Sequence, residues 1–220
     1  VSVHELDTEY GVPKGYVRIA WGSSDPNKWE LTTLASGSEA PSAEDVDIAD
    51  ADGDGWPDII VACELAHLIY FKNPATDHRK TRWKRSIPKI TLNRGSFIRV
   101  FFADFNNDGL MDILATTGGT GVNKIAIQKK DGTFTPKQFF GFDGKRTKQV
   151  VASEAFDADG DGNVDLVMSS NFGKDLRIYW GNGKGEFKQK TKLPVPNPFN
   201  HIIDINFADT DGNGQKEIIL

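Results

Sequence analysis

The sequence contains a single cysteine, Cys63, so the chain cannot form an internal disulfide or a metal site built from several thiolates. It has no run approaching the roughly 18 consecutive apolar residues of a membrane-spanning helix, and we expect no membrane insertion. Neither an initiator Met nor a signal-like segment opens the chain, which we interpret as a mature or excised piece of a soluble protein.

Motifs that mark common enzymes and nucleic-acid-binding proteins are also missing. The sequence has no H-E-x-x-H, G-x-S-x-G or Walker A motif, and it holds only 4 histidines. Its charges are accompanied by no recognised nucleic-acid-binding module, so we expect no nucleic-acid partner. These absences favour a binding or structural protein over an enzyme.

What the chain does contain is one acidic motif in four copies. The copies are "DADGDGWPD" from Asp50, "DFNNDGLMD" from Asp104, "DADGDGNVD" from Asp157 and "DTDGNGQKE" from Asp209, at steps of 54, 53 and 52 residues. A period this regular indicates an array of equal supersecondary units.

Each copy lies between two short apolar runs, such as "VDIAD" and "DIIVA" around the first, and these runs predict a β-hairpin. Segments such as "LIYFKN" and "RWKRSI" supply a third and a fourth strand. Four strands in about 53 residues, without a convincing amphipathic helix, predict an all-β fold of four-stranded antiparallel β-propeller blades. Most aromatic residues at equivalent strand positions are interpreted as blade core, namely Trp21, Tyr70, Trp83, Tyr179 and Trp180, whereas Trp56 in the first loop is expected to be exposed.

The repeat boundaries predict three complete blades and two half blades in a single propeller domain or propeller segment. The complete blades are residues 41–93, 94–147 and 148–199, and the half blades are residues 1–40 and 200–220. The N-terminal half is expected to supply a third and a fourth strand near Tyr16 to Leu34, and the C-terminal half a first and a second. The two halves would either close a ring of four blades, which removes unpaired sheet edges, or belong to a longer propeller of, for example, seven blades.

The acidic motif predicts a cation site in every copy, because side-chain oxygens recur at positions 1, 3, 5 and 9 and a backbone carbonyl is available at position 7. Two carboxylates about 4 Å apart repel by roughly 4 kcal/mol at an effective dielectric constant of about 20, so the folded turn needs a cation. Oxygen ligands of flexible geometry favour Ca²⁺ over Mg²⁺, and we expect up to four structural Ca²⁺ ions. The predicted ligands are Asp50, Asp52, Asp54, Trp56, Asp58, Asp104, Asn106, Asp108, Leu110, Asp112, Asp157, Asp159, Asp161, Asn163, Asp165, Asp209, Asp211, Asn213, Gln215 and Glu217.

The residues around these ligands separate the motif from an EF-hand. A glycine at position 6 predicts a sharp backbone reversal in every copy, at Gly55, Gly109, Gly162 and Gly214. An EF-hand would need a bidentate Glu at position 12, but position 12 is Val61, Ala115, Met168 or Leu220. The loop is therefore expected to join the first two strands of a blade, and the fourth site, with Asn213 and the longer Glu217, is expected to bind most weakly.

The pattern D-x-[DN]-x-[DN]-G-x-x-[DE] between apolar strands, with turn pieces such as "DGTF" and "GNGKGEF", resembles the FG-GAP or VCBS repeat family over nearly the whole chain. The resemblance implies a β-propeller that holds calcium in the loop between the first two strands of each blade. Integrin α-subunit heads, fungal lectins and propeller domains of polysaccharide lyases and sugar dehydratases share this architecture, so the fold leaves the function open. Most members have seven blades, and this chain departs from that number.

Alternating strand directions place the acidic loops on one face of a blade array, while the second-to-third-strand loops and the blade-to-blade loops lie on the opposite face. We expect a ligand on that opposite face, although an ordinary solvated loop residue is the simpler interpretation of each polar residue there. The candidates are Glu64, His67, Arg94, Lys148, Asn171, Lys174 and His201.

The charges of the chain divide unevenly. The formal net charge is -5, but the acidic loops hold 14 of the 31 acidic residues, and four bound Ca²⁺ ions would change the net charge to +3. The basic stretch "RKTRWKR", residues 79–85, could then attract an anionic polysaccharide or surface, although a solvated outer strand is the simpler interpretation.

These observations together predict a calcium-stabilised β-propeller binding module with a carbohydrate or a protein surface as partner. Two alternatives remain: a polysaccharide lyase or sugar dehydratase domain with a site around His67, Arg94 and His201, and a structural repeat segment of a larger surface or filament protein. Extracellular modules hold calcium at about 10⁻⁴ to 10⁻³ M, so we expect an extracellular, periplasmic or cell-surface location.

Overall fold

The computed structural model describes residues 2–6, 13–64, 67–79, 82–88, 97–117, 123–139, 150–170, 176–194, 202 and 204–220. The chain divides into two compact units, Val1–Val100 and Phe101–Leu220. The described residues form β-strands and one short 3₁₀ helix, η1 (Pro26–Lys28), which confirms the predicted all-β fold. None of their helical segments has the length and apolar character needed to cross a bilayer.

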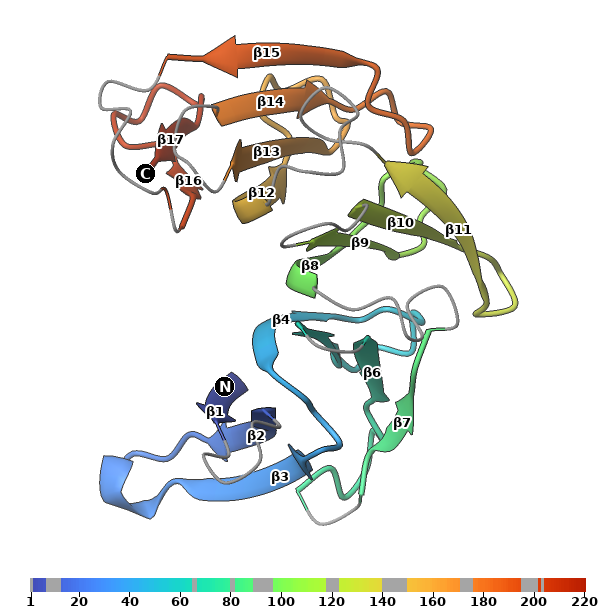
Figure 1. Ribbon diagram of the computed structural model, residues 1–220, viewed down its shortest axis with the longest axis vertical. Coiled ribbons are helices and arrows are strands. Elements are labelled where there is room, and N and C mark those ends of the chain that lie inside the picture. Colours follow the sequence, from blue (N-terminus) through green and yellow to red (C-terminus); the bar gives the residue numbers. More distant parts are fainter. Residues whose placement is uncertain are drawn as a thin grey trace. The chain divides into compact units, whose positions relative to one another are not determined.

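The first unit opens with a three-stranded antiparallel sheet (Figure 1). Its strands are β1 (Ser2–Leu6), β2 (Pro13–Trp21) and β3 (Glu30–Gly37), in the order β1-β2-β3. The expected two-stranded half blade was incomplete, because β1 pairs with the outer edge of β2 and places Val3 opposite Tyr16. An open strand edge offers a row of N–H and C=O groups, so a short flanking segment can pair with it without a motif of its own.

The next sheet has the four antiparallel strands that the first complete repeat predicts. They run in chain order as β4 (Ala43–Ala49), β5 (Asp58–Cys63), β6 (Leu68–Lys72) and β7 (Lys84–Ser86). Strand β5 is buried along its whole length, as expected for a mostly apolar strand with neighbours on both sides and a packed layer on each face. Strand β7 is exposed, so the basic stretch ends in a solvated outer strand.

Two further four-stranded antiparallel sheets and one two-stranded sheet follow along the chain. The first runs in the order β11-β10-β9-β8 and the second in the order β12-β13-β14-β15. The strands are β8 (Phe97–Ala103), β9 (Asp112–Thr117), β10 (Asn123–Gln128), β11 (Phe134–Phe139), β12 (Val150–Phe156), β13 (Asp165–Ser170), β14 (Leu176–Trp180), β15 (Gln189–Leu193), β16 (Asn206–Ala208) and β17 (Glu217–Ile219).

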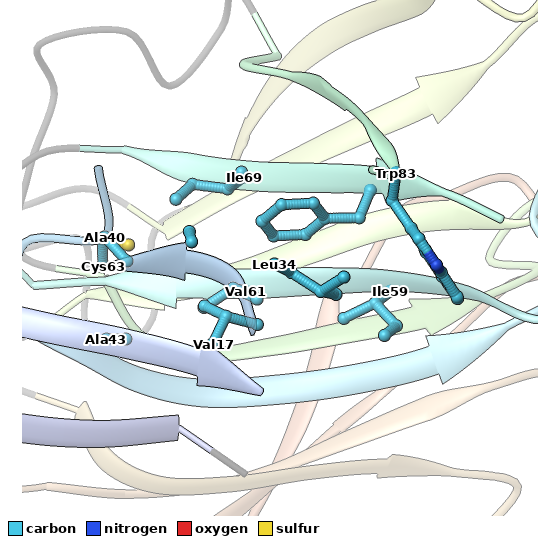
Figure 2. Close-up of a cluster of buried hydrophobic side chains, with 11 residues drawn as sticks. Val17, Leu34, Ala40, Ala43, Ile59, Val61, Cys63, Ile69 and Trp83 are labelled. Atoms are coloured by element: carbon cyan, nitrogen blue, oxygen red, sulfur yellow. The ribbon is translucent and has the colours of Figure 1, made fainter. Parts of the chain in front are cut away.

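The core of the first unit lies between its two sheets (Figure 2). Val17 from β2 and Leu34 from β3 pack with Val61 and Ile69 from the second sheet, and Trp83 closes one end of the cluster. Cys63 is fully buried in this cluster, and desolvation raises the pKa of its thiol to about 12, which confirms its interpretation as a small buried hydrophobe.

The aromatic residues that recur at equivalent strand positions divide between core and surface. Trp83 and Tyr179 are buried, as predicted, whereas Trp21, Tyr70 and Trp180 are only partly buried. Trp56 keeps 41% of its surface exposed, which confirms the expectation for a residue inside an acidic loop.

Candidate metal centres

The four acidic loops join the first and second strands of their sheets. Residues 50–58 lead from β4 into β5, 104–112 from β8 into β9, 157–165 from β12 into β13, and 209–217 from β16 into β17. The predicted placement is therefore confirmed for every copy.

Two left-handed residues shape each loop. At position 6 the φ angles are +86°, +84°, +86° and +87°, at Gly55, Gly109, Gly162 and Gly214. This conformation favours glycine because a Cβ atom would crowd the carbonyl oxygen, so the predicted reversal is confirmed. Position 4 is left-handed as well, which sequence reasoning missed, and it is occupied by Gly53, Asn107, Gly160 and Gly212.

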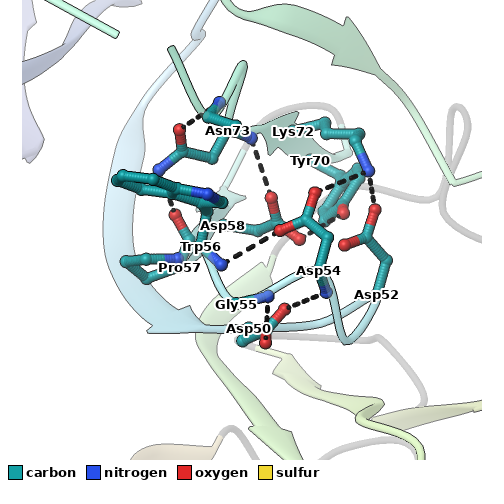
Figure 3. A network of polar contacts seen from close by, with 11 residues as sticks. Asp50, Asp52, Asp54, Gly55, Trp56, Pro57, Asp58, Tyr70, Lys72 and Asn73 are labelled. Atoms are coloured by element: carbon teal, nitrogen blue, oxygen red, sulfur yellow. Dashed lines mark hydrogen bonds and ion pairs between the residues drawn. The ribbon is translucent and has the colours of Figure 1, made fainter.

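The aspartate at position 1 holds the reversal in place. One of its oxygens accepts a hydrogen bond from the N–H of the position 6 glycine, at 2.8, 2.8, 3.0 and 2.9 Å in chain order. In the first loop (Figure 3), Asp50 also accepts from the N–H of Asp54 at 3.0 Å, and Asp54 accepts from the N–H of Trp56 at 3.0 Å. These short-range bonds are of the kind that Asp makes in turns, and they gather several carboxylates inside one loop.

The acid at position 9 ties the loop to the third strand in the three complete sheets. Asp58, Asp112 and Asp165 are at most 1% exposed. One oxygen of each accepts a backbone N–H at the end of the third strand, at 2.7 Å in every case; the donors are Asn73, Gln128 and Gly181. This second role of the predicted ligand could not be read from spacing, because the donor lies 15 or 16 residues away along the chain.

Burial also changes the acidity of these three carboxyls. Desolvation raises the pKa of Asp58, Asp112 and Asp165, that of Asp112 to about 6, while the hydrogen bonds from the backbone oppose the rise. In the fourth loop Glu217 stays partly exposed and accepts from both the N–H and the hydroxyl of Thr210, at 2.7 and 2.6 Å, which lowers the pKa of Glu217.

Three loops bring carboxylate oxygens close enough together for one cation. In each group, one oxygen per residue lies within 4.8 Å of the others. Ca²⁺ binds oxygens at about 2.3–2.6 Å, so ligands on opposite sides of the ion are up to about 5 Å apart and the donor sets fit it. The groups are Asp50, Asp52 and Asp54; Asp157, Asp159 and Asp165; and Asp209, Asp211 and Glu217.

The second loop has a different donor set at position 3. The Asn106 amide donates to Asp108 at 3.0 Å, and its oxygen accepts the Asp108 N–H at 3.1 Å. The position 7 carbonyls of all four loops stay predicted ligands.

An ammonium group accompanies the first loop. Lys72 contacts the Asp52 carboxylate directly, and its Nζ lies 3.2 Å from an oxygen of Asp54 (Figure 3). Lys72 directly precedes Asn73, whose N–H binds the position 9 carboxylate of its sheet. The residues at the same place in the two later four-stranded sheets are Ile127 and Trp180. The ammonium group of Lys72, at the end of β6, therefore neutralises part of the negative charge of the first loop.

The second and third loops are linked to each other within the second unit. The Asn107 amide donates to the side-chain oxygen of Asn163 at 2.7 Å. The backbone N–H of Gly185 donates to the Phe105 carbonyl at 2.8 Å, and the rings of Phe105 and Phe187 meet edge to face at 5.9 Å. The second loop thus contacts the third loop through Asn107 and the segment between β14 and β15 through Phe105.

The predicted opposite-face residues are described only in part. Glu64 and His67 lie beside the turn between β5 and β6, at the other end of β5 from the first acidic loop, and the Cys63 N–H donates to the His67 carbonyl at 3.1 Å. Desolvation, followed by the charge of Arg85, lowers the pKa of His67. Arg94, Lys148, Asn171, Lys174 and His201 lie outside the described residues.

Antiparallel four-stranded sheets whose first hairpin carries an acidic, glycine-reversed loop define an all-β repeat protein with candidate divalent-cation sites. The sequence matches the FG-GAP-like repeat model twice, over residues 104–168 and 157–220. The matches cover more than half of the chain, which therefore belongs to the FG-GAP-like repeat family and confirms the resemblance stated from the motif. No curated protein matches the sequence significantly.

Solved structures of similar fold include a lectin from Agrocybe aegerita that recognises non-reducing terminal N-acetylglucosamine. It matches with a TM-score of 0.58 and 18% identity over 99% of this chain and 60% of the lectin chain. A rhamnogalacturonan lyase from Bacillus licheniformis matches with a TM-score of 0.49 and 15% identity over 94% of this chain and 48% of the lyase. The V. cholerae biofilm matrix protein Bap1 matches with a TM-score of 0.36 and 20% identity over 92% of this chain and 40% of that chain. The chain thus spans less than two thirds of each of these proteins, and the lectin supports the likeness of fold alone.

Proposed function

We propose that the chain is a calcium-stabilised β-propeller module that recognises carbohydrate outside the cytoplasm. The observation that carries the calcium part is the repetition of one loop geometry, which gathers three carboxylates in each of the first, third and fourth loops. Family membership supports it, because the acidic loop is the motif shared by the repeats. Calcium at such loops would stabilise the folded chain by mass action and would leave the reversal glycines and position 1 aspartates in the conformation described here.

A propeller arrangement of the sheets is part of the same proposal. Each complete repeat forms one four-stranded antiparallel sheet, the unit from which propeller blades are built. The two-stranded sheet of β16 and β17 corresponds to the first two strands of such a unit. The number of blades, either four in a closed ring or more in a longer propeller, is also part of this proposal.

We place the carbohydrate on the face away from the acidic loops, as the sequence predicted. Glu64 and His67 mark that face at the far end of β5, and the remaining candidates are the five outside the described residues. The recognition of N-acetylglucosamine by the lectin of similar fold supports a sugar as the ligand to test first. A protein surface is the other partner that this face could bind.

Calcium titration and glycan binding test the two parts separately. Isothermal titration of chelator-treated protein with Ca²⁺ should show binding, and EDTA should lower the melting temperature; an unchanged melting temperature with no heat of binding would remove calcium from the proposal. A glycan array on the calcium-loaded protein should then identify a bound sugar, and binding should be lost in His67→Ala while the melting temperature stays constant. An array without signal, from a protein that binds Ca²⁺, would leave the metal sites and withdraw the carbohydrate.

A further inference from the structure

A cavity of about 270 Å³ opens beside the first acidic loop, at one end of the first unit's core. Its walls come from both sheets of that unit and from the segments next to them. Trp21 lies on β2, Ile48 on β4 and Ile59 on β5, while Trp56 belongs to the acidic loop and His78 and Trp83 to the segment before β7.

Aromatic rings form much of this wall, and hydrogen bonds hold them in place. The His78 ring lies between two indoles, with ring centres 5.1 Å from Trp21 and 5.8 Å from Trp56. The Trp21 indole N–H donates to the Thr32 hydroxyl at 2.8 Å, and the Trp83 indole N–H donates to the His78 carbonyl at 2.9 Å. The Trp21 and Trp83 rings are therefore fixed before any ligand arrives, which reduces the entropy lost on binding.

The polar lining atoms are largely occupied by the protein. Besides the Trp21 and Trp83 indoles, the Asn73 amide donates to the Pro57 carbonyl at 2.9 Å and its oxygen accepts the Ala75 N–H at 2.9 Å. No acidic, lysine or arginine side chain is among the described residues that line the cavity. Because burying a charge or an unbonded hydroxyl is costly, this lining selects an uncharged group that needs few hydrogen bonds.

The mouth of the cavity exposes apolar surface to solvent. Ile48 is 59% exposed and Trp56 is 41% exposed. A dry cavity of about 150 Å³ can hold benzene, so the larger volume here suits a group of one or two rings. Flat walls and aromatic partners favour a ring that can stack offset or edge to face.

We propose that this cavity binds a compact, uncharged aromatic group, in the class of phenol or indole. The ring enters past Ile48 and Trp56, contacts the wall aromatics where they line the cavity and leaves their hydrogen bonds intact. The Arg79 guanidinium, which does not line the cavity, lies over the Trp21 ring at 5.0 Å. This site is separate from the opposite-face carbohydrate surface, because Trp56 and Pro57 are positions 7 and 8 of the first acidic loop. The proposal depends on the cavity alone and not on the proposed binding of calcium or carbohydrate.

Binding of indole and p-cresol to the full chain tests the proposal, by isothermal titration and by saturation-transfer NMR. Trp56→Ala should weaken indole binding about tenfold, since a stacked aromatic pair is worth up to about 1.5 kcal/mol beyond its buried area. Ile48→Glu should weaken it further by bringing a charge to the mouth. Trp29→Ala is the matched control, because Trp29 is 49% exposed and does not line the cavity, and it should leave binding unchanged.

The alternative probes decide the chemistry of the occupant. Cyclohexanol, similar in size to phenol but not aromatic, and a methyl pyranoside should bind more weakly than indole. If the pyranoside binds best and loses affinity in Trp56→Ala, the cavity is a sugar site and the aromatic class is wrong. If no probe binds, or if indole binds Trp56→Ala and the unmodified chain equally, the site is overturned. The proposed function is still tested separately, by the loss of glycan-array signal in His67→Ala, at the other end of β5, and by the calcium titration.

Discussion

The first and third acidic loops share the residues D-A-D-G-D-G and a final Asp, and differ only at positions 7 and 8. Their backbones agree closely: φ is +74° at Gly53 and +80° at Gly160, and +86° at both Gly55 and Gly162. Their surroundings differ, because Lys72 contacts the first loop while the uncharged Trp180 stands in the corresponding place beside the third. Local sequence therefore sets the shape of the loop, and the neighbouring strand sets the charge that a cation meets.

The carboxylates also group differently in the two loops. In the first loop the close group is Asp50, Asp52 and Asp54, the last two of which contact Lys72; in the third loop the buried Asp165 replaces the position 5 acid. Lys188 lines a pocket together with Asp159 and Asp161 of the third loop, but its ammonium group lies 2.7 Å from Glu186. A cation in the third loop would therefore meet carboxylates that are less directly neutralised than Asp52 and Asp54. We therefore expect the third loop to depend more strongly on calcium than the first.

The largest expected effect is the loss of calcium-dependent stability in Asp157→Ala. A site filled a hundredfold above its dissociation constant stabilises the fold by about 2.7 kcal/mol, or a shift in melting temperature of roughly 5–10 °C for a chain of this size. Asp50→Ala, the matched change in the first loop, should remove less, because Lys72 already stabilises the apo loop. Calorimetry in excess Ca²⁺ and in EDTA measures each difference, and equal losses in the two variants would show that Lys72 does not matter.

Repetition explains how much of this comparison the sequence could predict. Four copies of the motif located the loops, the strands on either side and the reversal at Gly55 and its equivalents, because local spacing and left-handed glycine are properties of a few adjacent residues. Lys72 was not recognised, since its contact with Asp52 joins residues 20 positions apart. The one available signal was that "LIYFKN" has a lysine where "LRIYWGN" has Trp180.

The features that sequence reasoning missed share a dependence on pairing between distant segments. Strand β1 exists because the edge of β2 accepts it, with Val3 opposite Tyr16, and not because of a motif within residues 2–6. The cavity beside Trp56 likewise needs β2 and the segment around His78 to meet. Blade-like sheets follow from a repeated pattern, but the contacts between such sheets follow from packing.

The second-largest expected effect concerns the hydrogen bond from Asn107 in the second loop to Asn163 in the third. These loops are joined to each other, whereas the first loop is contacted by Lys72. Asn107→Ala should destabilise the chain by about 2 kcal/mol, because it removes the bond to Asn163 and places alanine at a φ of +58°. Asn107→Gly loses the same bond but accepts the backbone conformation, so it should cost about 1 kcal/mol. Urea unfolding in EDTA measures both, and an Asn107→Ala variant as stable as the unmodified chain would show that the link carries no energy.

The smallest expected effect is a gain in calcium affinity when Lys72 is replaced by methionine. Lys72→Met keeps the length of the side chain and removes the ammonium group that competes with a cation for Asp52 and Asp54. The Lys72 side chain is 40% exposed, and exposed ion pairs are worth up to about 1 kcal/mol, so the first loop should bind Ca²⁺ about fivefold more tightly. Lys84→Met, on the neighbouring exposed strand and opposite Lys72 in the register, removes the same formal charge away from the loop and should change affinity little. Each lysine change is combined with Asp157→Ala, so that calcium titration of the double variant does not include binding by the third loop. A weaker first site in Lys72→Met would mean that the lysine orders the carboxylates for the metal instead of competing with it.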